Sequence, residues 1–118
     1  MFVHTPISIA EVCKIPDLNV VHPGDGSREI EGVIVGDLLS HILGEARKNW
    51  LWVTIQSHLN VAAVAVLKEL PMIILSSNRI PQDDMAEKCR EEDIALATTH
   101  LNSYEMCCRL RSLGALLT

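Results

Sequence analysis

Residues 51–98 read LWVTIQSHLNVAAVAVLKELPMIILSSNRIPQDDMAEKCREEDIALAT, and this stretch decides the fold. It contains three short apolar runs at 51–55, 72–75 and 94–98, whose first residues lie 21 and 22 positions apart. Short apolar runs bounded by polar or turn-forming residues are typical of strands. The spacing leaves room for a crossover helix between successive strands, and such a crossover forces parallel pairing. The stretch therefore predicts consecutive right-handed βαβ units.

Helical patterns follow each of these strands. Helices are expected at 60–69, 82–92 and 103–113. Asn102 and Glu105 form a capping box at the start of the last helix, and Gly114 stands where a C-terminal cap belongs. Continuously apolar strands are typical of a sheet that is covered on both faces. We therefore expect an α/β fold with three α/β/α layers, a mostly parallel sheet of four or five strands and βαβ crossovers.

The N-terminal part is expected to add shorter elements to the same domain. A capping box at Ser8 opens a short helix, and Asp37 is placed to cap a helix over 38–47. Two further strands, joined through the turn-forming residues 23–26, are expected at 18–21 and 29–35. The sequence does not determine which strands they pair with.

Composition limits the class of protein. The 118 residues support a single domain over 1–118, and 48% of them are apolar. The net charge is −5 and no basic block occurs, so nucleic acid is not an expected partner. The longest apolar run, 61–67, has seven residues, whereas a membrane span needs about 20, so no membrane partner is expected. No basic leader with an apolar core is present, and we expect a cytoplasmic protein whose cysteines are reduced core thiols.

Enzyme signatures are absent from the sequence. The six glycines form neither a P-loop nor a dinucleotide-binding pattern, and neither a zinc-protease motif nor a nucleophile elbow occurs. The histidines and cysteines show no metal-ligand spacing. We therefore expect a protein that is not an enzyme, without cofactor or metal.

Polar residues follow the predicted strands, where ligands bind in open α/β sheets. The candidate ligand-binding residues are Asp37, Gln56, Ser57, His58, Asn60, Ser76, Ser77, Asn78, Arg79, Thr98, Thr99 and His100. Helix N-termini offer free N–H groups, and Arg79 adds a positive charge, so this rim predicts a site for a phosphate or carboxylate. The same residue types also cap helices and form turns, which leaves a purely structural interpretation open.

Two further features of the sequence suggest functions of other classes. His58 and His100, with Arg79, could form an acid–base or metal site if their loops converge, although most surface histidines have no such role. The segment 59–67, within the next predicted helix, is apolar on nearly every side and must be covered on every side. Either one chain buries it fully, or a second copy covers its outer face in an isologous dimer. An interaction module without a ligand and an enzyme are therefore the alternatives to a ligand-binding domain.

Residues 52–116 resemble the DRTGG domain, a small α/β module. In that family an Asp-Arg follows one strand and opens an Ala-rich helix, and a Thr-Gly-Gly follows the next strand before a proline and an acidic helix. In this chain, the segment that corresponds to the Asp-Arg is 56–60, Gln-Ser-His-Leu-Asn. The segment that corresponds to the Thr-Gly-Gly is Ser76-Ser77-Asn78-Arg79, which precedes Pro81. The segment 7–37 is also similar to the start of this domain and to the non-catalytic N-terminal domain of HPr kinase.

The resemblance implies a regulatory role. DRTGG domains occur alone, beside CBS domains and in the regulatory half of long bacterial phosphate acetyltransferases. The Asp-Arg and Gly-Gly of the family are absent from this chain, so if these residues bind a ligand in relatives, this chain binds a different ligand or none. We expect a small regulatory domain that binds an anionic metabolite or nucleotide at its strand ends, signals to a partner protein and forms a homodimer.

Overall fold

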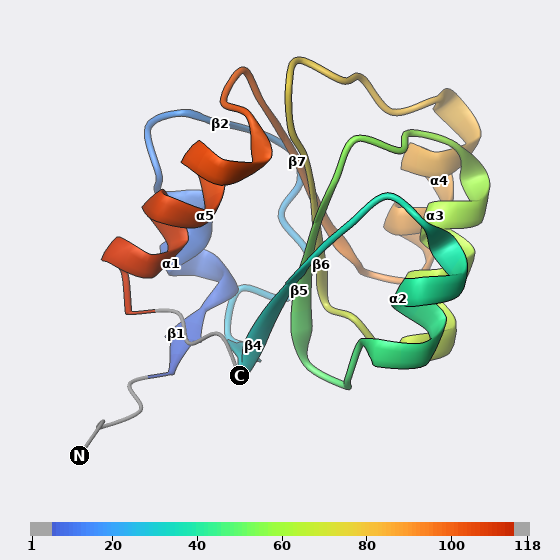
Figure 1. Ribbon diagram of the computed structural model, residues 1–118, viewed down its shortest axis with the longest axis horizontal. Helices are drawn as coiled ribbons and strands as arrows, with labels where there is room; N and C mark the ends of the chain where they lie inside the picture. The colour runs from blue at the N-terminus through green and yellow to red at the C-terminus, as the bar shows by residue number, and fades with distance from the viewer. Residues whose placement is uncertain (1–5, 115–118) are drawn as a thin grey trace.

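The computed structural model describes residues 6–114 of the chain (Figure 1). Within this range the elements are β1 (Ile7–Ser8), α1 (Ile9–Cys13), β2 (Leu18–His22), β3 (Glu29–Ile30), β4 (Gly32–Val35), α2 (Leu39–Glu45), β5 (Trp50–Thr54), α3 (Leu59–Lys68), β6 (Met72–Leu75), α4 (Asp83–Glu91), β7 (Ala95–Thr99) and α5 (Ser103–Ser112). The three strands and three helices expected after residue 50 are therefore all present, with bounds shifted by one residue or less at nearly every end.

The main sheet has five strands in the order β2-β7-β6-β5-β4. The strands β4 to β7 are parallel, and β2 joins the edge of the sheet antiparallel to β7. Helices α1 and α5 cover one face, and α2, α3 and α4 cover the other (Figure 1). The predicted three-layer fold with a mostly parallel sheet is confirmed.

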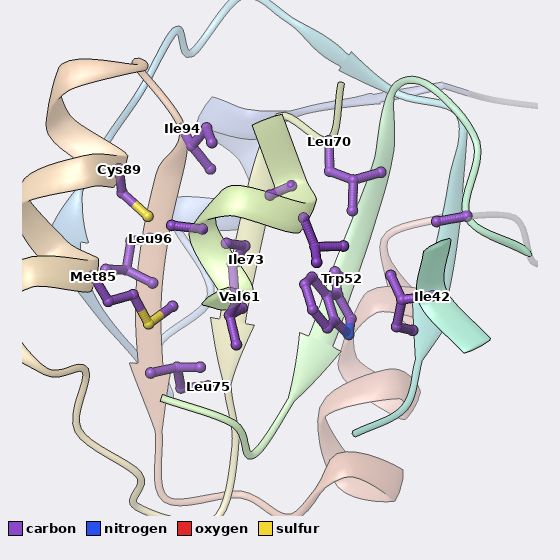
Figure 2. Packing of buried hydrophobic residues seen from close by; sticks show 14 of the residues in the cluster. Ile42, Trp52, Val61, Leu70, Ile73, Leu75, Met85, Cys89, Ile94 and Leu96 are labelled. Atoms are coloured by element: carbon purple, nitrogen blue, oxygen red, sulfur yellow. The ribbon is translucent and has the colours of Figure 1, made fainter. Parts of the chain in front are cut away.

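Successive side chains of each strand point to opposite faces of the sheet, so the core consists of two clusters, one on each face. Leu51 and Val53 of β5 point into the cluster beneath α1 and α5. Trp52, between them in sequence, points into the cluster beneath α2, α3 and α4, which Figure 2 shows from close by. All three side chains are fully buried. Burial of both strand faces explains why these strands are continuously apolar.

The segment predicted as one strand over 29–35 is two strands in different sheets. β3 pairs with β1 in a two-stranded sheet, where Ile30 lies opposite Ile7, and β4 pairs with β5. The prediction was wrong because neighbouring residues of one apolar segment find partners in different parts of the fold. The chain between β2 and β4 also connects opposite edges of the main sheet, since β2 lies beside β7.

The predicted helix caps and core thiols are largely confirmed. Capping boxes are formed by Ser8 at the start of α1 and by Asn102 at the start of α5. Gly114 follows α5 with a φ of +97°. Cys89 is buried in the core, and this burial raises the pKa of its thiol to about 11. Cys13 and Cys107 are half-buried, and burial also raises the pKa of each. Cys108 is exposed, so the prediction of a core thiol was wrong for this residue.

Candidate functional site

The loops that follow β5, β6 and β7 lie at the same edge of the sheet because these strands are parallel. Backbone hydrogen bonds join them to one another. The amide of Ser77 donates to the carbonyl oxygen of Leu101, in the loop after β7, at 2.7 Å, and the amide of Asn78 donates to that of Thr99, at the end of β7, at 2.9 Å. The amide of Gln82 donates to the carbonyl oxygen of Ser57 at 2.9 Å. Hydrogen bonds therefore hold the three loops together as one rim at this edge of the sheet.

This rim contains a hollow of about 300 Å³ at the ends of β6 and β7, which we call the strand-end hollow. Its lining residues are Asn19, Asn78, Arg79, Ile80, Thr98 and Thr99. Four of them were predicted from the sequence. None of the six carries a carboxylate, and within residues 6–114 no acidic side chain pairs with Arg79. The hollow thus presents one unneutralised positive charge beside amide and hydroxyl groups, a composition that suits an anion.

Asn19 and Ile80 were missed by the sequence interpretation. Asn19 lies on β2 and is paired in register with Thr98 of β7. Because the sequence did not determine the partner of β2, nothing placed Asn19 beside the rim. Ile80 follows Arg79 directly, and 79% of its surface is exposed, so it offers an apolar wall to a ligand.

The hydroxyl groups of two predicted site residues are hydrogen-bonded to the surrounding framework. The hydroxyl of Ser76 is hydrogen-bonded to that of Ser103 at 2.8 Å, and Ser76 is completely buried. The hydroxyl of Thr99 donates to the carbonyl oxygen of Asp17 at 2.8 Å and accepts from the amide of Leu101. These contacts leave the side chains of Asn19, Asn78, Arg79 and Thr98 as the groups that can bind.

The loop after β6 makes a tight turn at Ser77 and Asn78. Both residues have positive φ, +57° and +60°, and the amide of Arg79 donates to the carbonyl oxygen of Ser76. This is the backbone of a type I′ turn, which glycine adopts most readily. The amides of Ser77 and Asn78 are already bonded within the rim, so they form no cradle for a phosphate. An anion would therefore find no free donor at these two amides.

Ser77→Gly is expected to raise the free energy of unfolding by about 0.5–1 kcal/mol. An L-residue in the left-handed region costs about 1–2 kcal/mol, and the greater flexibility of glycine in the unfolded chain offsets part of this gain. The measurement is urea unfolding followed by circular dichroism. Ser40→Gly, at an exposed position in α2, should instead lower stability by a few tenths of a kcal/mol. If both variants were destabilised equally, the turn would not be strained.

A second polar cluster lies at the ends of β4 and β5. One carboxylate oxygen of Asp37 accepts from the hydroxyl of Thr54 and from the amide of Ile55, both at 3.0 Å. The side chain of Gln56 donates to the carbonyl oxygen of Asp37 at 3.1 Å, and its own oxygen lies 3.1 Å from Nε2 of His58. This cluster ties the loop after β4 to the loop after β5.

The prediction that Asp37 caps the helix over 38–47 was wrong. The helix α2 begins at Leu39 with Leu38 as its N-cap, and no side chain caps it. The carboxylate of Asp37 instead accepts hydrogen bonds from the end of β5, a partner distant in sequence that local capping rules do not consider.

His58 and His100, the two histidines predicted as an acid–base or metal pair, are not hydrogen-bonded to each other in the described part of the chain. His58 follows β5 and His100 follows β7, so β6 lies between them, and two strand spacings amount to roughly 10 Å. His58 contacts Gln56, whereas His100 and Asn60 are exposed. Among residues 6–114 no three His, Cys, Asp or Glu side chains gather in a way that could hold a metal ion. None of the helices in that range has the length and apolar character that crossing a bilayer requires.

No protein-family model matches the sequence, and no curated protein matches it. A solved structure with a similar fold contains the CBS and DRTGG domains of the regulatory region of Clostridium perfringens pyrophosphatase, complexed with the activator diadenosine tetraphosphate. The TM-score is 0.68 and the sequence identity is 12%. The match covers 85% of this chain and 43% of that one, so this chain spans less than half the length of that structure. At the level of the fold, the resemblance to the DRTGG domain is confirmed.

Proposed function

We propose that this chain is a regulatory domain that binds a small anionic metabolite or nucleotide in the strand-end hollow and signals to a partner protein. The observation that carries the proposal is the position of Arg79, which lines the hollow without an acidic partner among the described residues. Because backbone hydrogen bonds already hold the surrounding loops in place, binding would require little ordering of the rim.

The residues that line the hollow would make three different kinds of contact with a ligand. The guanidinium of Arg79 would pair with a phosphate or carboxylate, which its planar shape suits. The amides of Asn19 and Asn78 and the hydroxyl of Thr98 would donate or accept hydrogen bonds, and Ile80 would contact an apolar portion of the ligand. A volume of about 300 Å³ is at the small end of known ligand sites. The nucleotide activator of the Clostridium regulatory region supports a nucleotide as one class of ligand.

We also propose that the chain is cytoplasmic and forms a homodimer. The four cysteines include no disulfide, which is the usual condition of a reducing compartment. The outer side of α3 is apolar, which is unusual for a monomer's surface and favours contact with another chain.

Loss of the positive charge in Arg79→Ala is expected to abolish ligand-induced stabilisation. The probes are AMP, ATP, diadenosine tetraphosphate and citrate, each added in a thermal-shift experiment. A probe present at about 100 times its dissociation constant stabilises the fold by roughly 2.7 kcal/mol, which raises the melting temperature by several degrees. We expect at least one probe to produce this rise with the wild-type chain and none to produce it with Arg79→Ala.

Arg111→Ala is the matched control, since Arg111 is an exposed arginine on α5, far from β6 in the sequence and not part of the hollow. This variant should retain the full rise in melting temperature. If no probe stabilises the wild-type chain, or if Arg79→Ala keeps the stabilisation, the proposed ligand site is wrong. An interaction module without a ligand would then be the better description.

A further inference from the structure

A second hollow lies beside β4, the strand at the edge of the main sheet opposite β2 (Figure 1). Its volume is about 390 Å³, and it is lined by residues 33–35 of β4 and by His41, Glu45, Arg47 and Trp50. We call it the β4-edge hollow. None of these residues lines the strand-end hollow, so the two sites are separate. A volume of this size is in the range of known small-molecule sites.

Trp50 gives this hollow an aromatic wall because its neighbour on β4 is a glycine. Trp50 lies opposite Gly32 in the register of β4 and β5. A Cβ atom on Gly32 would lie 2.6, 2.7 and 2.9 Å from three atoms of the indole, so the ring lies over Gly32, at the edge of the sheet. Trp50 is half-buried, whereas Trp52 is completely buried. Part of the Trp50 ring is therefore open to the hollow.

The indole N–H of Trp50 is an available hydrogen-bond donor. It makes no hydrogen bond to another described residue, whereas the N–H of Trp52 donates to the carbonyl oxygen of Gly36 at 2.9 Å. Within residues 6–114 no buried polar side-chain atom lacks a partner, so the N–H of Trp50 is accessible. The wall therefore combines an aromatic surface with a polar group.

The outer side of β4 presents backbone groups to the hollow. Among the described strands β4 pairs only with β5, so the N–H and C=O groups on its other side have no strand partner. Only residues 33–35 line the hollow, whereas strands usually have about five or six residues. This open edge is short for an added peptide strand. It is long enough for a flat ring, and a nucleobase displays donors and acceptors side by side on its rim.

The charged side chains around the hollow favour a neutral ligand. His41 and Glu45 of α2 and Arg47 after it are exposed, and none of them forms an ion pair with another described residue. The charges of Glu45 and Arg47 cancel, whereas Arg79 leaves the strand-end hollow with one positive charge. A carboxylate accepts hydrogen bonds from ribose hydroxyls in other nucleotide-binding folds, a contact that Glu45 can make.

We propose that the β4-edge hollow binds a purine nucleoside, with its base stacked on the indole of Trp50. The polar groups of the ligand have partners in the indole N–H, the open edge of β4 and the side chains of Glu45 and Arg47. A purine offers the indole a larger ring than a pyrimidine does, so stacking buries more apolar area. Because the site is a separate one and the ligand is neutral, the inference does not rest on the proposed function.

Isothermal titration calorimetry of the full chain with adenosine tests the inference. The wild-type chain should bind one adenosine, and uridine should bind more weakly. Trp50→Leu removes the aromatic wall but keeps an apolar side chain, and it should weaken adenosine binding about tenfold or more, the usual effect of losing a base–aromatic stack. Tyr104→Leu is the matched control, because Tyr104 is 77% exposed on α5, on the other face of the sheet. This variant should bind adenosine as the wild-type chain does.

Tryptophan fluorescence gives a second measurement on the wild-type chain. The chain has two tryptophans, and Trp52 is completely buried, so a ligand can reach only Trp50. Adenosine stacked on Trp50 should quench the emission along the same binding curve that calorimetry gives. Binding without quenching would place adenosine away from Trp50 and overturn the inference.

The remaining outcomes separate this site from the strand-end hollow. The inference is wrong if the wild-type chain does not bind adenosine, or if Trp50→Leu keeps the wild-type affinity. If Trp50→Leu keeps that affinity and Arg79→Ala loses it, adenosine occupies the strand-end hollow, which supports the proposed function instead. Should Trp50→Leu lose its helical circular dichroism, Glu45→Gln decides, since Glu45 is exposed. We expect that variant to bind adenosine about fivefold more weakly or worse, and an unchanged affinity overturns the inference.

Discussion

Trp52→Ala is expected to lower the free energy of unfolding by about 3–5 kcal/mol, more than any other single substitution discussed for this chain. The indole is completely buried between β5 and the helices α2 and α3 (Figure 2). Removing it would leave a large cavity in the centre of one core cluster. It would also remove the hydrogen bond from Nε1 to the carbonyl oxygen of Gly36, which is 2.9 Å long.

Trp52→Phe separates the hydrogen bond from the packing. Phenylalanine fills most of the cavity but leaves the Gly36 carbonyl oxygen without this donor, so we expect a smaller loss of about 1–3 kcal/mol. Urea unfolding followed by circular dichroism measures both variants. A loss below about 1 kcal/mol for Trp52→Ala would show that the indole does not fill the core as described.

The half of the chain after residue 50 could be predicted well because its partners are close in sequence. The strand expected at 72–75 is β6 with the same bounds, and the helix expected at 103–113 is α5, which ends one residue earlier. In a βαβ unit each strand pairs with the next one along the chain, so local periodicity and spacing also determine the topology.

The N-terminal half was harder to predict because its contacts are distant in sequence. β2 pairs with β7, and the register places Asn19 opposite Thr98, nearly 80 residues later. Asp37 likewise binds the end of β5 and not the helix that follows it. The part of the strand-end hollow around Arg79 was therefore visible in the sequence, whereas the contribution of β2 required the fold.

The connection from β2 to β4 depends on a close approach of Gly24 to β7. Gly24 has a φ of +59°, in the left-handed region. A Cβ atom at this position would lie 2.8 Å from the backbone nitrogen of Ala95 and 3.0 Å from its Cα atom. Because these are backbone atoms of a buried strand, they cannot move aside as a flexible side chain could. Any residue other than glycine must therefore displace the connection or the strand.

Gly24→Ala is accordingly expected to lower the free energy of unfolding by about 2–4 kcal/mol. The loss has two causes: alanine is strained in the left-handed backbone conformation, and its Cβ atom is forced against the backbone of β7. Gly44→Ala is the matched control, since a Cβ atom there meets no atom within 4 Å and Gly44 lies in α2. That variant should gain about 0.5–1 kcal/mol from the higher helix propensity of alanine. Urea unfolding of the two variants should give changes of opposite sign. Equal stability of Gly24→Ala and the wild-type chain would mean that the connection does not pass against β7.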